Sequence, residues 1–226
     1  LGGCSEGAVT DESGRLIDPV VLGETGTHPG QFVYPRAMDI YKDGERNLAV
    51  VIDKTARMQV IDLDSGESVG ETLMPIFDRG MPTGVSVGVS LFESDRLAAY
   101  VADTHEHRVL MYELPLDGSG AAFAFGTFGE GEGEFVYPTD VIVRTDESGA
   151  ASELLISEYG GNDRAEGGDV QLVWNGQIGT PSETVDGSDG EVALSRPQSI
   201  ALWEREGAVE LIVVDSSHHR VGRVGL

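Results

Sequence analysis

The stretch that decides the fold is Pro29-Gly-Gln-Phe-Val-Tyr-Pro-Arg-Ala-Met-Asp-Ile40. The chain repeats it as Glu132-Gly-Glu-Phe-Val-Tyr-Pro-Thr-Asp-Val-Ile-Val143. A second phrase, Ala49-Val-Val-Ile-Asp-Lys-Thr-Ala-Arg-Met-Gln-Val60, recurs as Ala99-Tyr-Val-Ala-Asp-Thr-His-Glu-His-Arg-Val-Leu110 and as Leu211-Ile-Val-Val-Asp-Ser-Ser-His-His-Arg-Val221. Repetition of this kind indicates that one structural unit is arrayed several times.

Three anchor residues fix the register of four copies. The anchor prolines are 47, 56 and 59 residues apart, and an acidic residue follows each of them after 18, 21, 20 and 18 residues. An arginine follows four to six residues after each acidic residue. The anchors are Pro35, Asp53 and Arg57; Pro82, Asp103 and Arg108; Pro138, Glu158 and Arg164; and Pro197, Asp215 and Arg220.

Each copy contains short segments rich in Val, Ile and Leu, which read as strands. In the first copy they are Ala37–Tyr41, Leu48–Ile52 and Met58–Ile61. A fourth strand follows the third in the complete copies, and it is clearest after the second copy's third strand, at Ala121–Phe125. The other copies repeat the pattern at Gly84–Ser90, Ala98–Ala102, Val109–Tyr112, Asp140–Val143, Leu154–Ser157, Val170–Trp174, Ser199–Leu202, Leu211–Val214 and Val221–Val224. No segment has a long helical period, so helices are at most minor. Four short strands per unit predict an all-β fold, a β-propeller of four-stranded antiparallel blades.

The anchors resemble the NHL repeat. That family combines a glycine-rich turn, Phe and Pro with a later Asp-x-x-x-His-Arg turn, as in Gly126-Thr-Phe-Gly-Glu-Gly-Glu-Gly-Glu-Phe-Val-Tyr-Pro138 and Val101-Ala-Asp-Thr-His-Glu-His-Arg-Val109. The resemblance covers nearly all of residues 15–226. The third copy departs from it, because Glu158 replaces the aspartate and extra residues follow Arg164.

The repeat units are expected at about 24–66, 67–120, 121–178 and 179–226, after a polar tether at 1–14. Residues 15–23 read as a lone fourth strand that would complete the last blade and close a four-bladed ring. NHL-like propellers usually have six blades, so we expect instead about four blades of a larger, six-bladed propeller. Open blade edges would then be prone to pair with other chains.

Composition excludes one class of partner. The chain has 39 Asp and Glu against 15 Lys and Arg, a formal charge of −24. Some NHL-type propellers bind RNA through a basic face, and such affinity comes largely from Lys and Arg on phosphates. We therefore expect no nucleic-acid partner, and a protein or glycan partner instead.

The single cysteine suggests a location. Leu1-Gly2-Gly3-Cys4 resembles a bacterial lipobox, in which the cysteine carries the lipid of a lipoprotein. The polar residues that follow suit a tether between a membrane and a domain. We expect a protein of the cell envelope, lipid-anchored at Cys4 or secreted, on the periplasmic or outer surface. An incidental surface cysteine is the alternative.

Four histidines are candidate binding residues: His105, His107, His218 and His219. Some NHL-related propellers are zinc-dependent lyases, but a catalytic zinc site needs three converging ligands. His107 and His219 directly precede an anchor arginine, so a turn histidine bonded to neighbouring backbone is the simpler interpretation. His105 and His218 do not occupy matching positions in the repeat, so they discriminate better between a metal site and a structural turn histidine.

The acidic and arginine anchors favour a structural role, in which the carboxylate accepts backbone N–H groups and pairs with arginine. Glu158 and Arg164, where the copies disagree, are added to the candidate binding residues. Two acidic segments could supply oxygen ligands to Ca²⁺: the alternating Glu130, Glu132 and Glu134, and the run Asp186–Glu191. We expect both to be solvated loops. No cofactor is predicted, and calcium or zinc remains open.

Two functions follow. The first is a non-enzymatic, extracytoplasmic NHL-repeat propeller that binds a protein or ligand as a scaffold. The alternative is a metal-dependent propeller enzyme, a lyase, lactonase or sugar dehydrogenase. No catalytic residue is proposed, because no nucleophile elbow or phosphate-binding loop occurs.

Overall fold

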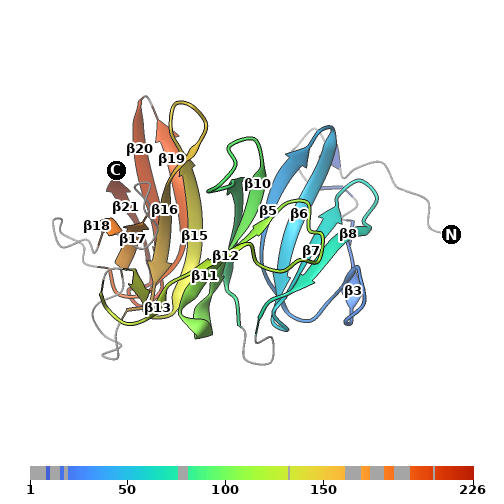
Figure 1. The fold of residues 1–226 in the computed structure, drawn as a ribbon, viewed down its shortest axis with the longest axis horizontal. Helices are drawn as coiled ribbons and strands as arrows, with labels where there is room; N and C mark the ends of the chain where they lie inside the picture. The colour runs from blue at the N-terminus through green and yellow to red at the C-terminus, as the bar shows by residue number, and fades with distance from the viewer. Residues whose placement is uncertain are drawn as a thin grey trace.

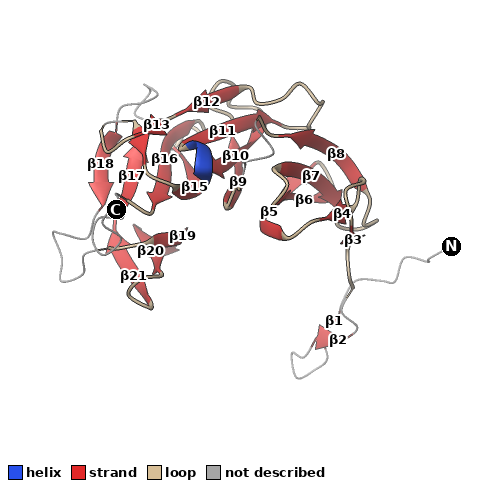
Figure 2. Cartoon of the chain, turned by 90° about the horizontal axis from the view of Figure 1, so that it is seen from below, coloured by secondary structure: helices blue, strands red, loops and turns tan. Residues whose placement is uncertain are grey.

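Four antiparallel β-sheets stand side by side in an arc in the computed structural model of this chain (Figure 1; Figure 2). The structure describes residues 9–10, 16–17, 20–75, 81–131, 133–160, 169–173, 181–185, 194–205 and 207–226. Within this part of the chain, a single turn of 3-10 helix, η1 (Thr104–Glu106), interrupts the strands. The prediction of an all-β fold is confirmed.

Three of the sheets have four strands and one has three, each in simple sequence order. Sheet 1 comprises β5 (Pro35–Asp43), β6 (Arg46–Asp53), β7 (Arg57–Asp62) and β8 (Ser68–Leu73). Sheet 2 comprises β9 (Gly84–Val89), β10 (Leu97–Asp103), β11 (Arg108–Glu113) and β12 (Phe123–Phe125). Sheet 3 comprises β15 (Pro138–Thr145), β16 (Ala151–Glu158), β17 (Asp169–Val173) and β18 (Pro181–Val185). Sheet 4 comprises β19 (Pro197–Arg205), β20 (Ala208–Asp215) and β21 (Arg220–Gly225).

The anchors begin and end these strands as the sequence indicated. Each first strand of sheets 1, 3 and 4 begins at its anchor proline, which pairs with the acidic anchor at the end of the second strand. Each third strand of sheets 1, 2 and 4 begins at its anchor arginine. A proline suits a strand's first residue because it donates no ladder hydrogen bond.

Three two-stranded pairs lie outside the sheets. Two of them, β3 (Glu24–Thr25) with β4 (Gln31–Phe32) and β13 (Thr127–Phe128) with β14 (Glu134–Phe135), are equivalent parallel pairs from the glycine-rich turns. In the third, β2 (Leu16–Ile17) pairs with β1 (Val9–Thr10). The alternative that we did not favour, in which residues 15–23 complete the last sheet, disagrees with the pairing of β2, because β2 pairs with β1 and lies near the opposite end of the arc from β21 (Figure 2).

The first strands of the sheets line the inner side of the arc, and the fourth strands lie on its outer rim (Figure 2). Strand β9 packs against both β5 and β15, and β15 packs against β19. This radial order of strands is that of propeller blades.

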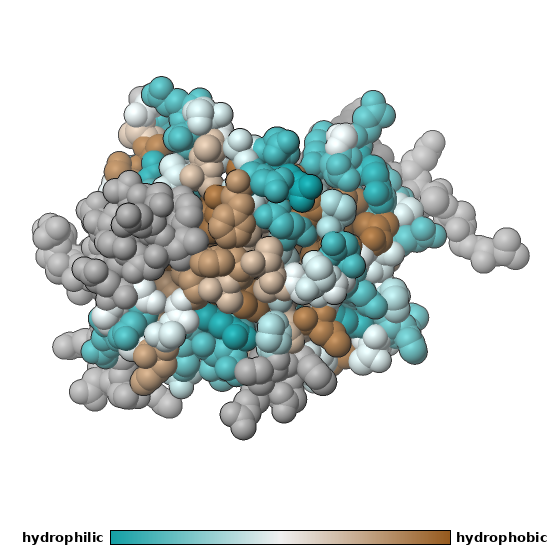
Figure 3. All heavy atoms as spheres, in the orientation of Figure 1, coloured by the Kyte–Doolittle hydropathy of each residue, from teal (hydrophilic) through white to brown (hydrophobic). Residues whose placement is uncertain are grey.

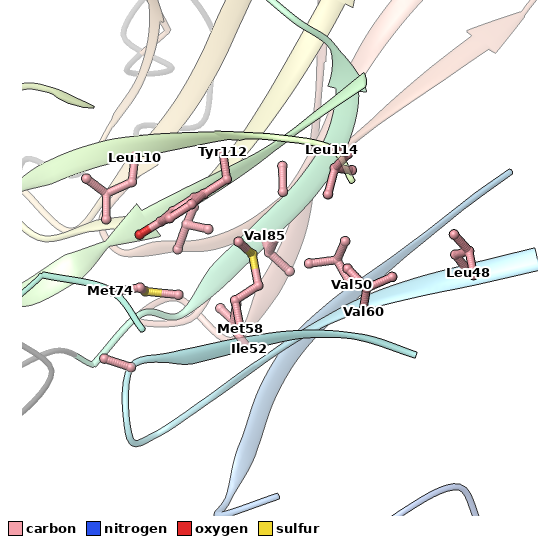
Figure 4. Close-up of a cluster of buried hydrophobic side chains, with 13 residues drawn as sticks. Leu48, Val50, Ile52, Met58, Val60, Met74, Val85, Leu110, Tyr112 and Leu114 are labelled. Atoms are coloured by element: carbon pink, nitrogen blue, oxygen red, sulfur yellow. The ribbon is translucent and has the colours of Figure 1, made fainter. Parts of the chain in front are cut away.

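Apolar side chains fill the spaces between neighbouring sheets. Between sheets 1 and 2, residues such as Ile52, Met58 and Val85 point toward one another (Figure 4). Equivalent clusters join sheet 2 to sheet 3 and sheet 3 to sheet 4. Each inner sheet is thus buried on both faces, which explains why its middle strands read as continuous apolar runs.

Among the described residues, no helix has the length and apolar character needed to cross a lipid bilayer. On the face shown in Figure 3, hydrophilic residues surround apolar patches near the middle of the view.

Candidate binding face

The turns that carry the anchors gather on one edge of the arc, which we call the turn face. The acidic anchor at the end of a second strand accepts backbone N–H groups from the turn before the first strand of its own sheet. Val33 N donates to Asp53 Oδ2 at 3.2 Å, and Arg196 N donates to Asp215 Oδ1 at 3.0 Å. The two kinds of turn are therefore held together, and β3 and β13 mark their edge at the bottom of Figure 1.

The anchor arginine pairs with the acidic anchor of its own copy. The nitrogen–oxygen distances are 3.0 Å for Arg57 and Asp53, 2.8 Å for Arg108 and Asp103, and 3.1 Å for Arg220 and Asp215. Burial alone would raise the pKa of Asp53, but hydrogen bonds from Thr55, Val33 and Arg57 together lower it. The predicted structural role of these anchors is confirmed for the three described pairs.

Asp103 differs from the other aspartate anchors. Burial raises its pKa in spite of the hydrogen bond and charge of Arg108. Its Oδ1 atom has no hydrogen-bond partner among the described residues. The amide that repeats the role of Val33 would be that of Gly80, two residues before Pro82, which lies outside the described residues.

His107 joins sheet 2 to the turn that precedes sheet 3. Its Nδ1 atom accepts a hydrogen bond from Tyr137 N at 3.1 Å. Both residues have left-handed backbone, with φ of 54° for His107 and 58° for Tyr137. Such angles cost energy in residues other than glycine, so the surrounding contacts must hold them. The prediction that this histidine hydrogen-bonds to backbone is confirmed, but the amide belongs to the turn before the next sheet and not to the histidine's own turn.

Burial lowers the pKa of His107, and the nearby His105 adds to this effect while Glu106 opposes it. A lowered pKa keeps the imidazole neutral, and only the neutral ring has an unprotonated Nδ1 that can accept the hydrogen bond from the Tyr137 amide.

Aromatic side chains surround this junction and reach the solvent. The His107 ring lies 4.7 Å from Phe128 and 4.5 Å from Tyr137, and the His105 ring lies 5.9 Å from Tyr137. Phe128 is 61% exposed and Tyr137 is 39% exposed. We call these four residues the aromatic cluster. It is an aromatic surface with polar imidazole and phenol groups on the turn face.

The fourth copy uses its histidines differently. His218 Nδ1 lies 2.7 Å from Asp215 Oδ2, so this ring is held within its own turn. His219 occupies the position of His107, with φ of 51°, and is exposed. The structure thus places His105 and His107 at sheet 2 and His218 and His219 at sheet 4.

Glu158 repeats the role of the aspartates. Its Oε2 atom accepts a hydrogen bond from Val136 N, and its side chain is buried. The next residue, Tyr159, donates its hydroxyl to Gln198 Oε1, and its ring lies 4.4 Å from the Arg196 guanidinium. Arg164, Cys4, Glu132 and Asp186–Glu191 lie outside the described residues.

Sequence reasoning missed the polar contacts between inner strands. Thr83 and Thr139 each follow an anchor proline, and each hydroxyl donates to a carbonyl of the next sheet: Thr83 to Thr139 O at 2.8 Å and Thr139 to Pro197 O at 2.9 Å. The only trace of these contacts in the sequence is that a threonine directly follows two of the four anchor prolines.

Two inner-strand carboxylates tie sheets together in the same way. Asp39 Oδ2 accepts from Val87 N at 2.7 Å, and Asp140 Oδ2 accepts from Ile200 N at 3.0 Å. Burial raises the pKa of Asp140, and the charge of Asp39 adds to this effect. Both carboxylates serve the packing of the sheets.

The described residues contain no group of three His, Cys, Asp or Glu arranged to hold a metal ion. A hollow of about 600 Å³ lies away from the turn face, between sheets 1 and 2, where Tyr41, Lys42, Arg96 and Glu113 line it. Its lining combines two cations, Lys42 and Arg96, with four carboxylates, so it presents no surface of one charge.

The comparisons with known proteins support the fold. No protein-family model matches the chain, and no curated protein does either. Two similar solved structures are of BBS1N in complex with ARL6DN, from crystals soaked with lead or with mercury. They match with TM-scores of 0.53 and 0.56 at 13% and 14% identity, over 86% and 87% of this chain. The chain spans 52% and 56% of their lengths, about half. The fold is thus of the β-propeller type.

Proposed function

We propose that this chain is a non-enzymatic propeller scaffold of the NHL-repeat type that binds a protein partner on its turn face. The observation that carries the proposal is the aromatic cluster, where Phe128 is 61% exposed on an otherwise well-packed junction. Aromatic side chains with exposed rings are the residues that dominate binding energy at protein interfaces.

The cluster is prepared for binding before a partner arrives. The backbone of Tyr137 is fixed by its amide hydrogen bond to His107 and by the following strand β15, so little backbone entropy remains to be lost there. The entropy lost when a partner orders this surface is then smaller. Phe135, fully buried two residues before Tyr137, anchors the same turn to the core.

The candidate catalytic groups favour a scaffold over an enzyme. Each described anchor carboxylate is engaged with amides or arginine of its own copy. A metal-dependent lyase, lactonase or dehydrogenase would need such groups to converge on one point. The neighbouring structures, in which BBS1N is in complex with ARL6DN, offer a precedent for a protein partner.

Selection of peptides from a random display library tests the proposal. We expect peptides that bind the purified chain, and about tenfold weaker binding of those peptides to Phe128→Ala and Tyr137→Ser. Phe92→Ala is the matched control, because Phe92 is 55% exposed but lies in the β9–β10 hairpin. Binding that survives both cluster substitutions, or that Phe92→Ala abolishes equally, contradicts the proposal.

Metal analysis of the dialysed full chain tests the enzyme alternative. We propose a scaffold without a cofactor, so stoichiometric zinc or calcium retained with hydrolytic or lyase activity would overturn it.

We further propose that the protein acts outside the cytoplasm, tethered to the envelope through a lipid on Cys4. Expression with its native upstream sequence and mass spectrometry of the N-terminal peptide tests this. The expected result is a diacylglycerol-type mass increase that Cys4→Ser removes, and an unmodified Cys4 would refute the anchor.

A further inference from the structure

One backbone hydrogen bond fastens the two turns of a copy together in sheets 1, 3 and 4. The residue after the acidic anchor donates its N–H to the carbonyl of the residue before the anchor proline. These pairs are Lys54 and Tyr34 at 3.2 Å, Tyr159 and Tyr137 at 3.2 Å, and Ser216 and Arg196 at 3.0 Å. The pairs therefore occupy equivalent places on the turn face, and their side chains can be compared.

At two of these places the chain stacks a cation on an aromatic ring. The Lys54 ammonium of sheet 1 lies 5.5 Å from the centre of the Tyr34 ring. The Arg196 guanidinium of sheet 4 lies 4.4 Å from the centre of the Tyr159 ring of sheet 3. At such distances the negative face of an aromatic ring attracts a cation. The turn face thus uses cation–aromatic contacts within its own structure.

Tyr137 holds the same place in sheet 3, but no cation lies over its ring among the described residues. Its partner across the turns, Tyr159, has a ring where sheet 1 has the lysine, and that ring already takes Arg196. The rings against Tyr137 are those of His107 and His105, and the lowered pKa of His107 keeps that imidazole uncharged. Tyr137 stays 39% exposed, so a cation from outside can reach this junction.

The surroundings of the cluster are acidic. Phe128, the more exposed of its rings, stands in the segment 126–134, which has three glutamates and no lysine or arginine. Glu106 lies between the two histidines of the cluster in the sequence. The arginine of this turn, Arg108, is paired with Asp103 at 2.8 Å. A cation that approaches the cluster therefore meets exposed rings with carboxylates around them.

We propose that the partner bound on the turn face presents an arginine side chain to the aromatic cluster, where its guanidinium stacks against the exposed rings. The contact between Arg196 and Tyr159 is the precedent within the chain. Arginine suits this place better than lysine, because its planar, weakly hydrated guanidinium stacks on aromatic faces. The formal charge of −24 also steers a basic segment toward the chain. This inference rests on the proposed scaffold function and adds the chemistry of the partner.

The display peptides whose binding depends on Phe128 provide the test. We expect each of them to contain arginine. Each peptide is synthesised again with citrulline, a neutral group of nearly the same shape, in place of arginine. Fluorescence anisotropy should show that citrulline weakens binding to the wild type about tenfold, and weakens binding to Phe128→Ala much less. The smaller effect in Phe128→Ala separates stacking on the cluster from general attraction to an acidic protein, because this variant keeps the full charge.

The carboxylates are tested in the same assay. Glu106→Gln and Glu130→Gln should each weaken binding of the arginine peptide about threefold at low salt, and should leave the citrulline peptide unaffected. Asp95→Asn is the matched control, because Asp95 is an exposed carboxylate in the β9–β10 hairpin and its loss changes the total charge equally. Thermal melting followed by circular dichroism checks that each variant keeps its fold.

Two results would overturn this inference and leave the scaffold function standing. One is that peptides which need Phe128 bind without any arginine. The other is that citrulline weakens binding equally in the wild type and in Phe128→Ala, which would place the arginine elsewhere on the chain. If no selected peptide depends on the cluster, the scaffold function itself fails and this inference fails with it.

Discussion

The same substitution at two equivalent valines should have very different costs. Val109 and Val221 each follow an anchor arginine and each begin the inter-sheet face of a third strand. Val109 is fully buried between sheets 2 and 3, whereas Val221 is 67% exposed on the open face of sheet 4. Residue type and repeat position are matched, but Val109 has both a neighbouring sheet and the fourth strand β12 beside it, whereas β21 is the edge strand of sheet 4 among the described residues.

Replacing Val109 with Ala removes two buried carbon groups, worth about 1.6 kcal/mol at about 0.8 kcal/mol each. The cavity left behind adds to this, so we expect a total of about 2–3 kcal/mol. Val221→Ala should change the free energy of unfolding of the isolated chain by less than about 0.5 kcal/mol, as exposed substitutions usually do.

Urea unfolding followed by fluorescence and circular dichroism measures both values. With an m-value of about 2 kcal/mol/M, the Val109→Ala midpoint should fall by about 1 M or more, and the Val221→Ala midpoint should barely move. Equal losses in the two variants would refute the reasoning, because Val221 would then be buried in the isolated chain.

Three further predictions concern the turns. The pKa of His107 is lowered in the folded state, so its contribution to stability is present above pH ~6.5 and is lost as the pH falls. Calorimetry should therefore show a larger drop in melting temperature from neutral to acid pH for the wild type than for His107→Gln. Asp215→Asn should lower the free energy of unfolding by about 2 kcal/mol at neutral pH and by less near pH ~3. The pKa of Asp215 is lowered in the folded state, so its carboxylate stabilises the fold fully only above the pKa that it has in the unfolded chain. An equal cost at both pH values would contradict this. Gly126→Ala should cost about 3 kcal/mol, because φ is +98° and the added methyl meets the Phe135 ring, whereas Gly118→Ala, with φ +80° and open space, should cost about 1 kcal/mol in the same denaturation assay.

The sequence predicts the four sheets because their limits depend on local chemistry. A proline begins a first strand, an aspartate ends a second strand by accepting turn amides, and an arginine begins a third. The proline start recurs in sheets 1, 3 and 4 and the arginine start in sheets 1, 2 and 4, so most of this spacing is visible without a structure. Four-stranded sheets, minor helix and structural anchors were all predictable on this basis.

The aromatic cluster was only partly predictable. His105 and His107 were singled out, but Phe128 and Tyr137 were not, because neither is a usual metal ligand. Phe128 stands where the first copy has Thr25, and this difference between copies was the available signal. The contact itself depends on packing the turn before sheet 3 onto sheet 2, which no local pattern encodes.

A histidine in this repeat takes its role from the sheet beside it. His107 and His219 share a position, a left-handed backbone and an arginine neighbour, yet His107 is partly buried against the next turn and His219 is exposed. His107 is therefore committed to structure, since its Nδ1 already accepts the Tyr137 amide. His219 keeps the same backbone geometry with its ring exposed, so the turn packed beside a repeat-borne histidine, and not its position in the repeat, decides whether the ring is committed to structure.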